Sequence, residues 1–347
     1  MTCEITFLPV GNADSIIVKP ENGAAVIIDL PDFRPLLKWF DRRQENHISR
    51  IYITHAHKDH FAPLTKFVNF LENWIKVGNH VDTLCLPDGV LTLRAATDKV
   101  KSNRGENPCD SHRKDPLQDT LLKLNALTKT GLKILSANRD DNPYEDNLLH
   151  INNLHPSAIF LAQKPGRHNL TSLVQRVTYG KFSALLLADL EGEGITDLLE
   201  VTEHLPAELK AQVAKIPHHG GYPKNGNELK TLLEKIDPEI AILSVGSTNQ
   251  YGHVVPDLFS LLVNLKNDQS KQLRQFICTE ATKTCACSAT ERSAMEKRQG
   301  LPSRKLCAGE ITIVAETCGR FTVKTETKHS QEIAQLNYAA CDGRADL

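Results

Sequence analysis

The chain of 347 residues has no apolar run near the length of about 20 residues that a membrane-spanning helix needs. Its first residues, Met1 to Glu4, lead directly into a strand-like segment at 5–8, without the basic region or small-residue cleavage site of a secretory signal. These two absences predict a cytoplasmic protein with no membrane partner. The nine cysteines are then expected to be reduced thiols or metal ligands rather than a disulfide framework.

An excess of charge of either sign is also missing, because 41 basic residues face 42 acidic ones and the formal net charge is −1. A nearly neutral chain has no global field that gathers nucleic acid, so any site for a polyanion has to be local. This balance argues against a simple DNA-binding protein. It leaves open a phosphodiesterase whose charge is concentrated at one site.

Short β-rich segments alternate with helical ones along most of the chain, which predicts a layered α/β fold. The apolar segment 184–188 is one of the clearest of these strands, and it ends at Asp189. Further strands are expected near 5–8, 15–18, 25–28, 51–53, 213–216 and 240–245, and helices near 33–44, 194–204 and 228–236.

Two regions of the sequence depart from this pattern and suggest the domain boundaries. The predicted hydrolase domain spans 1–270, with a polar insertion at about 93–120 that is either a solvated surface loop or a lid over a substrate. Residues 271–347 are a C-terminal extension with a cysteine-containing insertion and a closing hairpin at 311–314 and 321–324. Four cysteines of this extension could hold a structural zinc ion, although their irregular spacing favours free thiols: Cys278, Cys285, Cys287 and Cys307.

The densest group of chemically active side chains is the run from His55 to His60, which follows the predicted strand 51–53. His55 and His57 are two residues apart, so on an extended segment both imidazoles point the same way and can bind one metal ion. Asp59 and His60 come immediately afterwards and can serve a second ion. This concentration of ligands predicts a metal centre rather than a solvated turn.

Three later strands deliver more candidate ligands at their carboxyl ends, where open α/β sheets place their sites. The strand 184–188 ends at Asp189, the next at the pair His218-His219, and the third near His253. Adjacent residues of a strand point to opposite faces, so both histidines of the pair are not expected to bind one ion. We prefer His218 as the ligand and expect His219 to support a ligand or contact the substrate.

The run His55-Ala56-His57-Lys58-Asp59-His60 resembles the HxHxDH signature of the metallo-β-lactamase fold. Four other segments, which follow one another in the same order, resemble the hydrolase domain of the ComEC family of competence proteins. They lie at 5–15, 186–191, 215–220 and 244–253, and the likeness extends from residue 2 to about 265. Five elements in order are far more specific than a single motif.

The resemblance implies an αββα four-layer sandwich with two divalent metal ions, most often zinc and sometimes manganese. It implies that a hydroxide between the ions attacks phosphorus or a carbonyl carbon. The implied ligands are His55 and His57 for the first ion, Asp59, His60 and one histidine of the pair 218–219 for the second, and Asp189 as the bridge.

Some positions are ambiguous against the family pattern. The fold usually supplies a third histidine to the first ion shortly before the bridging aspartate, whereas ComEC-like proteins tend to have an asparagine there. Both types occur here, as His168 and Asn169, and either could complete the site.

Three further residues are candidates for supporting roles. We interpret Asp29 and Asp14 as carboxylates that orient a ligand histidine, although Pro31 stands where the fold often has glycine and Asp29 could simply initiate a turn. His253 lies beyond the ligand set and could contact phosphate or protonate a leaving group; the alternative is a plain turn histidine beside Gly252.

The sequence thus favours a phosphodiesterase or nuclease, with Asp59 and His253 at the reaction centre and a nucleic acid or nucleotide as the phosphate-ester substrate. Hydrolysis of a carbon ester, such as a lactone, thioester or β-lactam, is the alternative, because function depends on the site and not on the fold. A binding module that has lost catalysis is disfavoured because the main ligand motifs are intact. ComEC proteins are membrane channels, so only the chemistry carries over, and nothing in the sequence predicts an oligomeric state.

Overall fold

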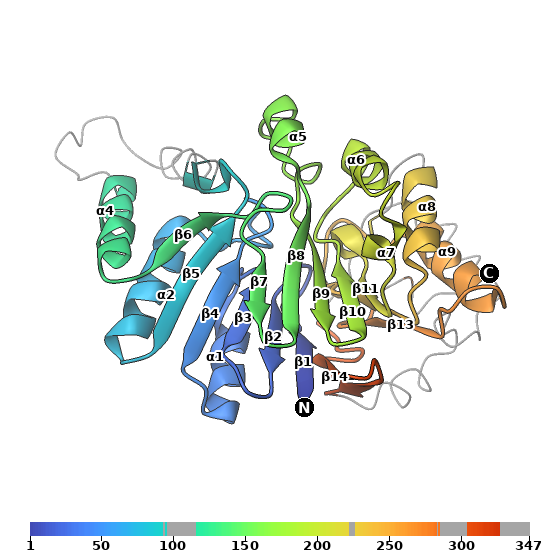
Figure 1. Cartoon of the computed structure of the whole chain (residues 1–347), viewed down its shortest axis with the longest axis horizontal. Coiled ribbons are helices and arrows are strands. Elements are labelled where there is room, and N and C mark those ends of the chain that lie inside the picture. The colour runs from blue at the N-terminus through green and yellow to red at the C-terminus, as the bar shows by residue number, and fades with distance from the viewer. Residues whose placement is uncertain (93, 96–115, 222–225, 283, 285–303, 327–347) are drawn as a thin grey trace.

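Two β-sheets stack face to face, and a layer of helices covers the outer face of each (Figure 1). The computed structural model describes residues 1–92, 94, 95, 116–221, 226–282, 284 and 304–326. Within these residues no helix is both long and apolar enough to cross a membrane. The four layers confirm the expected α/β class and the αββα sandwich.

The first sheet has eight strands in the order β15-β14-β1-β2-β3-β4-β5-β6. Strands β3 to β6 are parallel, and the remaining neighbours are antiparallel. The strands are β1 (Thr2–Phe7), β2 (Ile16–Pro20), β3 (Ala25–Ile28), β4 (His47–Tyr52), β5 (His80–Leu86), β6 (Lys133–Ser136), β14 (Ile311–Glu316) and β15 (Phe321–Thr325).

The second sheet has seven strands in the order β13-β12-β11-β10-β9-β8-β7. Strands β10 to β13 are parallel, and β7 to β10 are antiparallel. The strands are β7 (Tyr144–Asp146), β8 (Leu149–His155), β9 (Val174–Tyr179), β10 (Phe182–Leu186), β11 (Val213–Lys215), β12 (Ile240–Leu243) and β13 (Gln275–Cys278).

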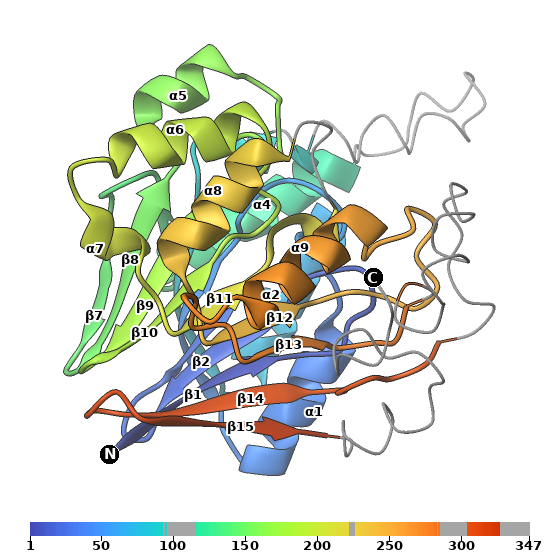
Figure 2. The same ribbon diagram turned by 90° about the vertical axis from the view of Figure 1, so that its right-hand side faces the viewer.

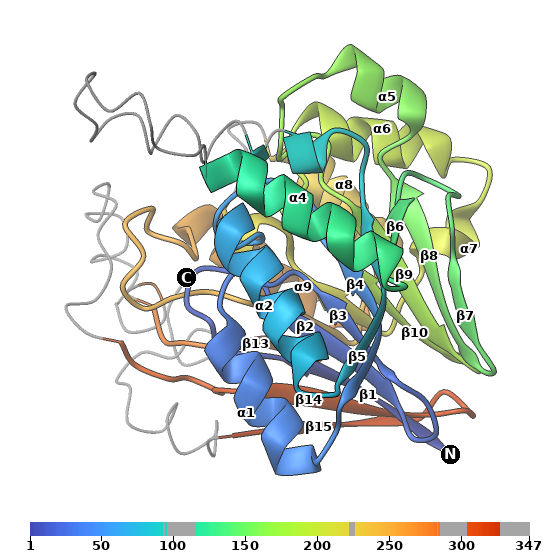
Figure 3. The ribbon, with the colours of Figure 1, turned by 90° about the vertical axis from the view of Figure 1, so that its left-hand side faces the viewer.

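The helices form the two outer layers. The layer on the second sheet appears in Figure 2 and contains α6 (Glu193–Val201), α8 (Asn227–Ile236) and α9 (Pro256–Asn267). The layer on the first sheet appears in Figure 3 and contains α1 (Phe33–Arg43), α2 (Leu64–Lys76) and α4 (Pro116–Lys129). Three short helices lie between strands: α5 (Ala158–Gln163), α7 (Pro206–Leu209) and the 3₁₀ turn η2 (Pro217–Gly220).

The central strands are apolar on both faces because each sheet is covered on both sides. In β3, Val26 and Ile28 face the other sheet, whereas Ala25 and Ile27 face the helices. The same alternation in β10 sends Leu185 toward the helices and its neighbours between the sheets. Strands buried on both faces read as continuous apolar runs, which is why they are prominent in the sequence.

The described residues beyond 270 complete both sheets. Strand β13 pairs with β12, and the hairpin of β14 and β15 pairs with β1. Phe276 and Ile311 consequently belong to the same apolar cores as the rest of the chain. The proposed cysteine site cannot be assembled from these residues, since Cys285 and Cys287 lie outside the described part, as does most of the polar insertion at 93–120.

Candidate metal centre

The segments that follow β3, β4, β10, β11 and β12 meet at one edge of the two sheets. Backbone hydrogen bonds connect them directly, from Asp29 N to Tyr52 O at 2.8 Å and from His218 N to Ala188 O at 3.0 Å. Carboxyl ends of neighbouring parallel strands lie at the same edge, so residues distant in sequence arrive at one place. The candidate ligands of the sequence are gathered there.

The first group of ligand atoms comes from His55, His57 and Asp189. His55 Nε2 lies 3.1 Å from His57 Nδ1 and 3.9 Å from Asp189 Oδ2. His55 is buried, and burial lowers the pKa of its imidazole well below the usual value, with a further lowering from the charge of His60. A histidine that stays neutral keeps a lone pair available for a metal ion.

The second group is built around His60 and His219, which are both buried. His60 Nε2 lies 3.1 Å from Asp189 Oδ1 and 3.3 Å from His219 Nε2. His219 Nε2 lies 3.4 Å from the same Asp189 oxygen and 3.7 Å from Asp59 Oδ2. Asp189 therefore presents one carboxylate oxygen to each group.

The hydrogen bonds behind these rings determine which nitrogen carries the proton. His60 Nδ1 donates to Asp29 Oδ2 at 2.6 Å, and His219 Nδ1 donates to the carbonyl of Ser244 at 2.9 Å. Each Nε2 is then left with a lone pair, and the two lone pairs face one another. When both rings are neutral this arrangement is repulsive, and either a second proton on His60 or a metal ion between the nitrogens relieves it. The donor set therefore fits a bound cation, which would replace that proton.

The same reasoning applies to His55. The Thr54 hydroxyl donates to Asp29 Oδ2 at 2.7 Å, so its oxygen accepts from His55 Nδ1 at 3.1 Å. The lone pair of His55 is thereby directed through Nε2 toward His57. Asp29 also accepts a hydrogen bond from the Thr54 backbone at 2.7 Å. One carboxylate thus orients a histidine in each group, as metal sites commonly require.

The buried charges shift the pKa values of this group strongly. Burial alone would raise the pKa of Asp189, but His219 and His60 hold it well below its usual value. Burial alone would lower the pKa of His60, but the carboxylates of Asp189 and Asp29 hold it well above. Burial alone would raise the pKa of Asp59, but the nearby His219 and the charge of His60 lower it to about 2. Asp189 and Asp59 are therefore ionised at neutral pH and able to bind cations, whereas burial raises the pKa of Asp29.

The pair 218–219 is arranged differently from the preference drawn from the sequence, because His219 joins the ligand group and His218 does not. His218 Nδ1 instead lies 2.8 Å from Glu191 Oε2. The argument from strand alternation does not apply, since β11 ends at Lys215 and both histidines have left-handed backbone angles in η2. With φ of 51° and 52°, the turn sends His219 inward and His218 toward the rim.

Asp14 lies close enough to belong to the second group, but its carboxylate contacts the ring nitrogens that do not face Asp189. Its carboxylate is 3.7 Å from His60 Nδ1 and 3.8 Å from His219 Nδ1, on the side away from both Nε2 atoms. Its ion-pair partner is the fully buried Lys215, which also donates to the carbonyl of Ala188 at 2.7 Å. The position of Asp14 is that of a supporting carboxylate.

Lys215 and Glu191 are residues to which the sequence reasoning assigned no role. The signal for Lys215 was a single lysine inside the apolar segment 213–216, since a fully buried lysine needs an anionic partner. Glu191 lies two residues after Asp189 and was noted only as part of a motif. Its oxygens contact His218 and, at 3.2 Å, the side-chain amide of Asn169.

The side chains of His168 and Asn169 contact different parts of the site. The His168 ring lies beside His57, with 4.7 Å between ring centroids, and so borders the first ligand group. The Asn169 amide lies 3.4 Å from His218 Nε2 at the rim. His253 is at the rim as well, with its ring centroid 5.2 Å from that of His218.

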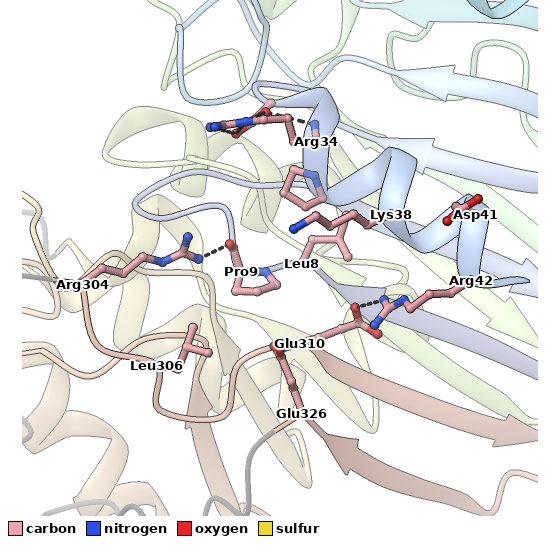
Figure 4. A pocket seen from close by; sticks show the side chains of 12 residues that line it. Leu8, Pro9, Arg34, Lys38, Asp41, Arg42, Arg304, Leu306, Glu310 and Glu326 are labelled. Carbon is pink, nitrogen blue, oxygen red and sulfur yellow. Dashed lines mark hydrogen bonds and ion pairs between the residues drawn. The ribbon is translucent and has the colours of Figure 1, made fainter.

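A hollow of about 800 Å³ lies elsewhere, against α1 (Figure 4). Lys38 points into it, while Arg42 is paired with Glu310 and Arg304 contacts the carbonyl of Pro9. Basic and acidic side chains are equally numerous in its lining. The hollow contains none of the candidate metal ligands and has no net charge that selects anions.

An αββα sandwich with histidine and aspartate ligands collected at one edge of its sheets is the arrangement of the metallo-β-lactamase fold, and this chain has that fold. No family model matches the chain. A stretch of 101 residues is 34% identical to ComE operon protein 3 of Bacillus subtilis. This match spans 29% of the chain and only 12% of that protein, so the chain corresponds to a small part of its relative.

Several solved structures are similar at low identity. A diphosphatase from the PhnP family has 13% identity and a TM-score of 0.39, over 71% of this chain and 87% of that one. The metallo-β-lactamase fold protein YhfI from Bacillus subtilis has 10% identity and a TM-score of 0.42, over 75% and 93%. The short form of human tRNase Z has 14% identity and a TM-score of 0.39, over 70% and 93%. None of these likenesses says what this chain acts on.

Proposed function

We propose that the chain is a metal-dependent phosphoesterase with two metal ions, acting as a phosphodiesterase or nuclease. The observation that carries the proposal is the position of Asp189 between two groups of histidines. Its Oδ2 lies 3.9 Å from His55 Nε2 and its Oδ1 lies 3.1 Å from His60 Nε2. A buried carboxylate with one oxygen toward each group is suited to join two cations.

The proposed ligands follow from the same contacts. His55 and His57 would hold the first ion, with His168 beside them. For the second position we propose His60 and Asp59, with His219 in place of the His218 preferred from the sequence, and Asp189 as the common ligand. Imidazole nitrogens mixed with carboxylate oxygens favour zinc, and manganese is the alternative. Two such ions would acidify a water molecule and stabilise the charge that develops on the substrate.

A complete second position supports phosphate esters over carbon esters. Paired metal ions can stabilise both the attacking and the leaving oxygen of an in-line displacement at phosphorus. Asp59 contributes to this position through its ionised carboxylate, 3.7 Å from His219 Nε2. At the rim, His218 and His253 lie where a leaving group would emerge, and we propose His253 as its proton donor or phosphate contact.

The test is a substrate panel with the purified chain and added zinc or manganese. We expect turnover of bis(p-nitrophenyl) phosphate, single-stranded DNA or cyclic nucleotides, and its loss in His57→Ala. The matched control is His150→Ala, a partly exposed histidine of β8 outside the ligand groups. Turnover of lactones alone would favour a carbon-ester hydrolase. Activity that survives both His57→Ala and Asp189→Ala would remove the metal mechanism.

A non-catalytic binding module is the remaining alternative. It predicts that the chain binds metal and a phosphate-containing ligand without turnover under any of these conditions. The panel distinguishes it, because metal content would be normal while every substrate remains intact.

A further inference from the structure

Three rings form a row that leads from the metal centre to the protein surface. His218 is the inner ring, and its centroid lies 5.2 Å from that of His253. Tyr251 stacks on His253 with 5.7 Å between centroids and 29° between planes. Tyr251 is also one of the large apolar side chains that the structure exposes, with 41% of its surface accessible. The row therefore ends in an accessible aromatic ring.

The loop that carries the two outer rings is held in place by side-chain hydrogen bonds. Asn249 Oδ1 accepts from His253 N at 2.8 Å, and Asn249 Nδ2 donates to His253 O at 2.7 Å. The Thr284 hydroxyl donates to the carbonyl of Val254 at 2.5 Å. Rings held before a ligand arrives lose little conformational entropy on binding, so a stacking contact there is effective.

The loop is also tied to the turn that carries the metal-centre histidines. Val255 N donates to the carbonyl of Gly220 at 3.0 Å, and Gly220 directly follows His219. The close fit continues at Gly221, where a Cβ atom would lie 3.1 Å from His253 Nε2. The ring row and the second ligand group are thus parts of one packed unit, which keeps their spacing constant.

A flat, exposed ring beside a centre that hydrolyses phosphate esters suits a substrate with a planar heteroaromatic group near the phosphate. Aromatic side chains stack on any nucleobase, because every base has a π-face. In a duplex these faces are covered by neighbouring bases, so an unpaired base is required. The near-neutral charge of the chain agrees with recognition by stacking rather than by a broad basic surface.

We propose that Tyr251, backed by the ring of His253, forms the stacking platform for the nucleobase adjacent to the scissile phosphate. The substrate class is then an unpaired nucleotide unit, in single-stranded nucleic acid or in a free nucleotide, rather than a simple phosphate diester. This inference rests on the proposed phosphoesterase function and names the substrate class of the same site.

The experiment compares Tyr251→Ala with Tyr251→Phe, which keeps the ring and removes only the hydroxyl. The substrates are oligodeoxythymidylate, an abasic oligomer of the same length, and cyclic mononucleotides. We expect Tyr251→Ala to raise KM for oligodeoxythymidylate roughly 5- to 150-fold, the range for losing one stacked base, with kcat nearly unchanged. Tyr251→Phe should resemble the unmodified chain, and the abasic oligomer should have a high KM that neither variant changes.

Binding of a fluorescent oligodeoxythymidylate to the metal-free protein gives a readout without turnover. We expect Tyr251→Ala to bind it more weakly than the unmodified chain, and Tyr251→Phe to bind it about as tightly. Leu205→Ala, at another exposed apolar side chain, is the control for a general surface effect.

Equal KM values for Tyr251→Ala, Tyr251→Phe and the unmodified chain would overturn the inference while leaving the phosphoesterase function intact. Absence of turnover on every phosphate ester would instead refute the underlying function. If Tyr251→Ala raises KM for the oligomer alone, the source of the base is nucleic acid. If it raises KM for cyclic mononucleotides equally, the source is a free nucleotide.

Discussion

The two ligand groups, which form the two halves of the proposed metal centre, differ in how firmly their histidines are held. In the second half, His60 and His219 are buried and each is fixed from behind, by Asp29 and by the carbonyl of Ser244. In the first half, His57 and His168 are only partly buried and lie beside one another. Both histidines of the second half are therefore held from behind, whereas in the first half only His55 is, through the Thr54 hydroxyl.

Asp189 is common to both halves, and removing it should have the largest effect. We expect Asp189→Ala to lose bound metal at both positions and to reduce hydrolysis by about 1000-fold or more, since bound metal supplies several kcal/mol of transition-state stabilisation. Metal content is measured by inductively coupled plasma mass spectrometry. Asp82→Ala, at an exposed carboxylate of β5, is the control. Retention of one full equivalent of metal would mean that the halves do not share this ligand.

Lys215 distinguishes the halves because its ammonium group lies behind the second one. Lys215→Met leaves Asp14 buried without its cation, and breaking such a pair costs about 3–5 kcal/mol. The free energy of unfolding of the metal-free protein in urea measures this loss. The double variant Asp14→Asn, Lys215→Met removes both charges and should recover most of the stability. No recovery would show that Lys215 acts by packing alone.

Asp29→Asn tests whether the second half depends on its supporting carboxylate. Loss of a carboxylate that orients a ligand histidine typically weakens metal binding about 10- to 100-fold. We expect this loss for the second ion and a smaller one for the first, because Asp29 contacts His60 directly but reaches His55 only through Thr54. Competition with a chelator measures both affinities. The control Asp82→Asn alters a surface pair, 2.8 Å from His47, and should change neither.

The smallest expected effect is the release of protons when metal ions bind. Carboxylates raise the pKa of His60 well above 6.5, so in the metal-free protein it holds a proton at pH 7 and stabilises the fold below pH 6.5. That stability is lost as the pH rises through the raised pKa. Burial lowers the pKa values of His55 and His57, which remain neutral at pH 7 and disfavour the fold as the pH falls below 6.5.

Binding of the second ion at pH 7 should therefore release about one proton, and binding of the first should release none. Calorimetric titration in buffers of different ionisation enthalpy measures the release. Equal release in both steps would show that the halves do not differ in protonation.

Much of this architecture was predictable from local patterns. The continuous apolar segments 25–28 and 184–188 indicated strands covered on both sides, and the run from His55 to His60 indicated where the candidate metal centre lies. The choice between His218 and His219 was not predictable. Strand alternation favoured one of them, but the chain leaves the strand at Lys215 and turns through left-handed angles.

The sequence by itself determined the layered α/β class, through periodicity along the chain, and the kinds of candidate ligand, through residue type. The four-layer sandwich was implied by the resemblance to a known fold. Only the tertiary structure decided which atoms face one another. Asp14 lies behind two histidines and pairs with Lys215, and Tyr251 extends a ring row from His218, through contacts between residues far apart in sequence. Such contacts depend on the stacking of the two sheets and on the direction of each turn at their common edge, which no local pattern encodes.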